Sequence, residues 1–285
     1  MLQKRSDAYL WWLNLAEEAV RREDYETAAR FYRYVAVHFG LLNDLDNMKK
    51  FAIKAGECYF NAGEKLWNSN PLKALLLCIN ASKCFREASD KQRVEQCDSV
   101  IKAYYDTIRK DEIIGSCKDA YDLKRIGDYF ATHNLQKAIK CYEAAAEKAF
   151  KDGKINLSGS LYGILGECYM ALNKYEAAAE SYAKSAEIYY ACRESFEAAW
   201  RYCISGFHFI LAGSADKALS MASRAESICR EDEINVILND LASICRLLSE
   251  GSIHEAKKKW DKIRIKLKKN YVKIINSCFR SMNRI

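Results

Sequence analysis

Proline and glycine are scarce in this chain of 285 residues, which contains one proline and 12 glycines. Sheet proteins and long loops use these two residues for their turns, so their scarcity argues against an all-β fold. Alanine, leucine, lysine, glutamate and arginine, all good helix formers, dominate instead. The chain is also too long for one compact bundle around a single core, yet no linker-like stretch divides it. The composition therefore predicts an elongated all-α protein.

Long apolar runs are also missing. Wholly apolar runs such as Ala74–Ile79 are far shorter than the roughly 20 residues needed to span a bilayer. Residues 1–7 are rich in charge and lack the apolar core of a secretory signal. We therefore expect a soluble, cytoplasmic protein, with peripheral attachment as the one remaining kind of membrane contact.

Signatures of metal binding and catalysis are absent from the sequence. None of the 12 cysteines stands in a Cys-x-x-Cys pair, and the four histidines lie far apart. The sequence has no glycine-rich phosphate loop, no Gly-x-Ser-x-Gly and no His-Glu-x-x-His. We expect no enzyme, no metal, no cofactor and no small-molecule substrate, and we interpret the thiols as small buried packing residues.

The positive charge is concentrated at one end. Residues 254–285 carry eleven lysines and arginines against two acids, whereas the whole chain has a formal charge of only +7. This stretch could be a solvated helix face, a surface for an acidic partner, or a contact for anionic lipid. Its aromatic residues stand at core-like spacing, so we expect no nucleic-acid partner.

A repeat runs along the chain. The segment Ala55–Tyr59 recurs almost intact as Leu165–Tyr169, and small residues mark Gly127, Gly166 and Gly206 at intervals of 39 and 40 residues. An alanine stands 11 or 12 residues after each such small residue, and in three of four cases an aromatic residue stands four positions after that alanine. These pairs are Ala28 with Tyr32, Ala138 with Tyr142 and Ala178 with Tyr182, while Ala218 is followed by Ala222. The small residue that precedes Ala28 is Ala16.

This pattern is typical of a tetratricopeptide-type helical hairpin, in which a small residue lets the second helix approach the first. The usual period is about 34 residues, so a pitch near 40 lengthens each helix by nearly one turn. We predict a right-handed αα-superhelix of about fourteen antiparallel helices, with a solenoid over residues 1–230 and a C-terminal cap over residues 231–285. The predicted helices span 6–22, 24–39, 44–66, 71–88, 90–109, 113–131, 135–152, 155–172, 174–191, 195–212, 215–230, 233–249, 253–267 and 270–284.

From about Lys118 onward the chain resembles the soluble N-ethylmaleimide-sensitive-factor attachment proteins, the SNAP family. The resemblance rests on the order of four phrases over roughly 165 residues: Asn134–Ala146, Asn173–Ala178, Leu247–Glu250 and Trp260–Ile263. Asn70–Ala74 is similar to a helix start of that family as well. The first half of the chain is similar in style only.

The resemblance implies a non-enzymatic adaptor of vesicle-mediated and intracellular protein transport. Such an adaptor binds the four-helix bundle of a SNARE complex and recruits an AAA ATPase of the NSF type, which disassembles the bundle. The family's basic inner-face positions fall here on Ser160, Trp200 and Asn239. The nearby candidates for SNARE binding are Lys118, Lys124, Arg125 and Arg201. The alternative that the repeat by itself supports is a generic tetratricopeptide scaffold for another protein.

Two further groups of candidates follow from the same resemblance. The candidates for ATPase contact are Asp216, Glu250, Glu255, Asp261, Met282 and Ile285, although the acidic tail of the family is not found here. In place of the family's apolar membrane loop, the turn 21–24 is charged, and Trp11 and Trp12 are the candidates for membrane contact. Aromatic residues at this helical spacing equally suit the end of a solenoid core, so both interpretations stay open.

Overall fold

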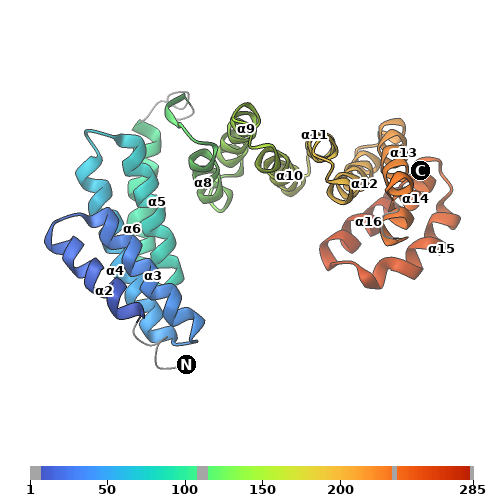
Figure 1. Ribbon diagram of the computed structural model, residues 1–285. Helices are drawn as coiled ribbons and strands as arrows, with labels where there is room; N and C mark the ends of the chain where they lie inside the picture. The colour runs from blue at the N-terminus through green and yellow to red at the C-terminus, as the bar shows by residue number, and fades with distance from the viewer. Residues whose placement is uncertain (1–7, 108–114, 233–235, 283–285) are drawn as a thin grey trace. The chain divides into compact units, whose positions relative to one another are not determined.

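The computed structural model describes residues 8–107, 115–232 and 236–282, and within these ranges it contains fourteen α helices, one 3-10 turn and no strand (Figure 1). The predicted all-α fold is confirmed. Consecutive helices pack as antiparallel pairs joined by short turns. Among the described residues, no helix is long and apolar enough to cross a membrane.

The chain divides into two compact units, residues 1–118 and 119–285. The predicted division near residue 230 is a different one and stays a prediction. The first unit contains α2 (Ala8–Arg21), α3 (Tyr25–Leu41), α4 (Leu45–Leu66), α5 (Pro71–Glu87) and α6 (Lys91–Thr107). The second unit contains α8 (Ala120–Ala131), α9 (Leu135–Lys151), α10 (Ile155–Ala171), α11 (Tyr175–Ala191), α12 (Ser195–Leu211), α13 (Ala215–Glu231), α14 (Val236–Ser249), α15 (Ile253–Ile263), the 3-10 turn η1 (Arg264–Lys266) and α16 (Lys269–Met282).

The turns explain the pitch of about 40 residues. Helices α9 to α13 each have 17 residues and are joined by turns of three. One residue in each of these turns adopts a positive φ, and these residues are spaced by 20: Gly153, Asn173, Arg193 and Gly213. A left-handed residue reverses the chain within three positions, so each helix and turn take half of the period.

Side-chain caps fix several helix starts. The side chain of Asn70 accepts a hydrogen bond from the Lys73 amide at 3.1 Å, ahead of a proline at the first helical position. Asn134 accepts in the same way from Lys137 at 3.1 Å. Ser214 and Ser252 precede α13 and α15 but make no such bond, and Asn173 lies in the turn before α11 with a positive φ. A helix is predicted over 113–131, whereas α8 begins only at Ala120, after the cap Asp119.

Small residues face large ones as the repeat predicts. A Cβ atom added at Gly127 would lie 2.6 Å from the Tyr142 ring, and one added at Gly166 would lie 2.7 Å from the Tyr182 ring. Glycine is thus required where the second helix of each pair lays its ring against the first.

The repeat is not uniform in two places. In the first unit two glycines of α4 face α5: a Cβ atom at Gly56 would meet the Phe85 ring at 2.6 Å, and one at Gly63 would meet Cys78 Sγ at 2.9 Å and the Ala74 carbonyl oxygen at 3.2 Å. At Gly206 the nearest atom is Cys245 Sγ of α14. With no ring at position 222, a thiol from the next helix occupies that space.

The cysteines are packing residues. None of the twelve forms a disulfide, and only Cys192 is not buried. Burial raises the pKa of the Cys58 thiol to about 11 and that of the Cys97 thiol to about 12. Thiolate formation is disfavoured at neutral pH, so these groups act as small apolar side chains.

Candidate protein-binding surfaces

Three of the predicted SNARE-binding residues lie on or beside α8. Lys118 is exposed directly before the helix. Lys124 Nζ pairs with Asp128 Oδ2 at 2.6 Å, and Arg125 Nη1 pairs with Asp122 Oδ1 at 3.1 Å. Because each helical cation stands beside a carboxylate, this surface has mixed charge instead of a continuous positive field.

Arg201, the fourth SNARE candidate, holds helices together. From α12 it lies beside Gly163 of α10, and its guanidinium carbon stands 5.8 Å from the centre of the Tyr182 ring. Its buried Nε has no hydrogen-bond partner within the described residues. The structure therefore places Arg201 apart from the α8 residues, in a packing contact between three helices.

The predicted acidic residues for ATPase contact have local roles. Glu250 pairs with Arg246 at 2.9 Å, and Asp261 lies 3.3 Å from Lys257 and 3.5 Å from Arg264. Asp216 and Glu255 are exposed in the first turns of α13 and α15, where the helix dipole favours negative charge. These acids do not form one acidic surface of their own.

The two apolar candidates of this group differ. Met282 is half-buried and packs against the core of the second unit. Ile285 lies outside the described residues. ATPase contact through either residue stays a prediction.

The two tryptophans of α2, which are candidates for membrane contact or for the end of the solenoid core, have different surroundings. The Trp12 ring is half-buried, with its centre 5.8 Å from that of Tyr34 and 6.4 Å from that of His38. Trp11 is 62% exposed and only touches Phe31 with its edge. Trp12 thus belongs to the core of the first hairpin, whereas Trp11 lies on its surface.

One edge of the second unit carries exposed apolar residues that the sequence analysis did not single out. We call it the turn edge: it holds the starts of α8, α10, α12 and α14 and the ends of α9, α11 and α13, which antiparallel pairing brings to the same side. Within the described part of helices α8–α14, all the exposed large apolar residues lie there. They are Tyr121, Phe150, Tyr190, Phe196 and Val236.

The turn edge is also hollowed. Next to the α11–α12 turn, a depression of about 680 Å³ is lined by Tyr190 and Phe196 together with Arg193, Glu231 and Asp232. Both rings are half exposed, at 50%. Phe150 and Tyr190 are separated by 40 residues, so this periodicity could have predicted the edge.

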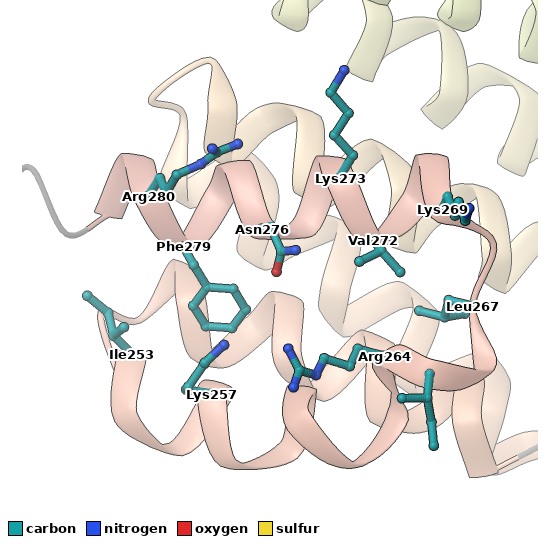
Figure 2. A pocket seen from close by; sticks show the side chains of 11 residues that line it. Ile253, Lys257, Arg264, Leu267, Lys269, Val272, Lys273, Asn276, Phe279 and Arg280 are labelled. Atoms are coloured by element: carbon teal, nitrogen blue, oxygen red, sulfur yellow. The ribbon is translucent and has the colours of Figure 1, made fainter.

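A second hollow, which we call the C-terminal groove, lies between α15 and α16 and has a volume of about 1060 Å³ (Figure 2). Figure 2 shows Val272, Asn276 and Phe279 pointing from α16 toward the facing helix. Its apolar lining is Ile253, Ile265, Leu267, Val272 and Phe279, and its charged lining is Lys257, Arg264, Lys269, Lys273 and Arg280. Among the described residues, none with a carboxylate lines it.

The groove exists because α15 and α16 do not pack closely along their lengths. Unlike the earlier pairs of the second unit, α16 packs chiefly against α12, and also against α14, while α15 packs against α14. The two helices meet through Trp260, whose Nε1 donates to Asn276 Oδ1 at 2.9 Å. Lys257 Nζ lies 5.4 Å from the centre of the Phe279 ring, which gives a second contact between the two helices.

No metal centre is apparent in the structure. The described residues contain no group of three or more His, Cys, Asp or Glu side chains that could hold an ion. The buried His208 uses Nδ1 to bond the Ile204 carbonyl oxygen at 2.7 Å, and burial lowers its pKa. It therefore stays neutral and structural at physiological pH.

No family model matches the sequence, and neither does any curated protein. Among solved structures, similarity is found to a Signal Transduction ATPase with Numerous Domains protein with a tetratricopeptide repeat sensor, from Pyrococcus horikoshii. The TM-score is 0.53 with 17% identity, over 92% of this chain and 42% of that one. This chain thus spans less than half the length of that protein, and the likeness shows a tetratricopeptide-like fold alone.

Two further structures have lower TM-scores. Aspartyl phosphate phosphatase F from Bacillus subtilis aligns at 0.41 with 15% identity, over 97% of this chain and 69% of that one. BtubC from P. vanneervenii aligns at 0.40 with 14% identity, over 83% and 90%. No SNAP protein is among these three structures.

Proposed function

We propose that this protein is a non-enzymatic scaffold that binds other proteins through exposed edges of a tetratricopeptide-like helical repeat. The observation that carries the proposal is the turn edge, where the exposed apolar residues of α8–α14 are gathered. Scattered single apolar residues are normal on a protein surface, but their confinement to one edge is not.

The chemistry of the turn edge suits a protein partner. Tyrosine, phenylalanine and arginine are enriched in protein interfaces, and Tyr190, Phe196 and Arg193 line one hollow with two acids beside them. A repeat of such contacts along one edge adds up several modest interactions, provided that one partner can engage them together.

Site-specific photo-crosslinking tests this function. We expect benzoylphenylalanine at Phe196 or Tyr190 of the full-length protein, expressed in its native cells, to yield discrete protein adducts. The same label at Lys174, which is exposed on the opposite edge, should yield none. Mass spectrometry of the adducts identifies the partner. Equal labelling at both edges, or no adduct at either turn-edge position, would contradict the proposal.

The narrower hypothesis, that the protein binds a SNARE bundle, is tested separately. If the basic residues near α8 grip an acidic coiled coil, the Lys118→Glu, Lys124→Glu and Arg125→Glu triple variant should capture a purified SNARE four-helix bundle at least about tenfold more weakly. The matched control reverses Lys174, Lys184 and Lys217 elsewhere in the unit. Unchanged capture by the triple variant would remove this assignment and leave the general scaffold role in place.

A further inference from the structure

The C-terminal groove combines two properties that bear on what it could bind. It has an apolar floor, and its whole charged lining is positive. Ile265 is 83% exposed there although it is a large aliphatic side chain. Such a side chain gains from burial, roughly 1.5–3 kcal/mol when fully covered, so the floor is suited to an apolar ligand surface.

Three of the five cations around this floor are not neutralised by any of the described residues. Lys257 and Arg264 share Asp261 at 3.3 and 3.5 Å. Lys269, Lys273 and Arg280 form no ion pair with any of the described residues. The groove therefore presents five cations with one nearby carboxylate, and a ligand that fits it must carry negative charge beside its apolar surface.

The shape of the groove favours a helix. It runs between α15 and α16, which pack little against each other because α16 packs on α12 and α14. In a helical repeat the trough between two helices is where a third helix packs, with its side-chain ridges in the groove. Since α15 has 11 residues, its length of about 16 Å matches about three turns of a bound helix.

We propose that the C-terminal groove binds an acidic amphipathic α helix of a partner protein. Apolar side chains spaced three and four residues apart would lie on Val272, Leu267 and Ile265, and flanking glutamates or aspartates would face the basic rim. This deepens the proposed function by naming the partner class for a second surface. It rests on the scaffold role, but the groove and the turn edge are tested separately.

Two other polyanions fit the groove less well. A bilayer surface is nearly flat and would reach the rim cations but not the recessed Phe279, which is 6% exposed. Nucleic-acid phosphates would leave the aliphatic floor unused, and the groove offers no exposed ring for base stacking. Both are outcomes that the experiment distinguishes.

The test uses the full-length protein and a fluorescein-labelled helical peptide of about 15 residues. Its leucines recur every three or four positions and its other face carries glutamates. We expect saturable binding with Kd below about 100 μM. The Lys269→Glu, Lys273→Glu and Arg280→Glu triple variant should weaken it at least tenfold, and Ile265→Ser, at an exposed site, should weaken it severalfold.

The matched control reverses three exposed cations on α15 and η1 that do not line the groove, as Lys258→Glu, Lys262→Glu and Lys266→Glu. This control has the same net charge as the groove variant and should bind within about threefold of the parent protein. Circular dichroism and melting temperature verify that all variants are folded. Hydrogen exchange should slow on α15 and α16 when the peptide binds.

The contrary results are equally definite. Equal weakening by the groove and control variants, or equal binding of a peptide with the same composition in scrambled order, would reduce the groove to a nonspecific cationic surface and overturn the proposal. So would the absence of saturable peptide binding, or groove-dependent binding of anionic vesicles or single-stranded DNA in place of the peptide. None of these results affects the crosslinks expected at the turn edge.

Discussion

Replacing Trp260 with alanine is expected to lower the free energy of unfolding of the second unit by about 3–5 kcal/mol. The indole is fully buried, and it joins α15 to α16 through its hydrogen bond to Asn276 and its contact with Phe279. Truncation leaves a cavity where the buried ring stood, and the contacts of its lining are lost. Urea unfolding followed by circular dichroism measures the loss.

Trp11 provides the matched control. The Trp11→Ala variant removes an equally large ring that is 62% exposed, so its effect on stability should stay below about 1 kcal/mol. Trp260→Ala should also abolish peptide binding in the C-terminal groove, because the walls lose their common anchor. A change in stability by Trp260→Ala no larger than that by Trp11→Ala would show that α15 and α16 are held in place by other contacts.

Adding a single methyl group at Gly166 is expected to destabilise the second unit by about 1–3 kcal/mol. In Gly166→Ala the new Cβ atom would stand 2.7 Å from the Tyr182 ring. That ring is 4% exposed and cannot swing into solvent, so α10 and α11 must move apart. This steric cost exceeds the gain in helix propensity of roughly 1 kcal/mol that alanine brings over glycine.

The same substitution at an exposed helical glycine should have the opposite sign. At Gly40, near the end of α3, the nearest atom to an added Cβ is Met48 Cγ at 3.5 Å, an ordinary contact. Gly40→Ala should leave stability unchanged or raise it by up to about 1 kcal/mol. A double variant, Gly166→Ala with Tyr182→Leu, should recover part of the loss through the smaller side chain. Destabilisation of equal size at both glycines would refute the steric explanation.

Much of the site geometry near α8 was accessible from the sequence. Lys124 and Asp128 are four residues apart, and Asp122 and Arg125 are three apart, so helical spacing alone predicts their ion pairs. The family resemblance selects the same cations for SNARE binding, and that role stays a prediction. The packing of Arg201 could not be predicted in this way, because Gly163 and Tyr182 contact it from two other helices.

The helical class, most helix bounds to within a few residues, and the 40-residue period with its glycine–tyrosine contacts could all be predicted from the order of the amino acids. These features depend on interactions within a turn of helix or between adjacent helices, which leave a periodic mark on the chain. Three-dimensional packing sets which of the described cations stay unpaired, that Gly63 faces α5 in addition to Gly56, and that α16 packs on α12. That last contact joins residues such as Cys278 and Phe207, 71 positions apart. Because such packing depends on the shapes of distant surfaces instead of local spacing, no period in the sequence records the groove that it opens.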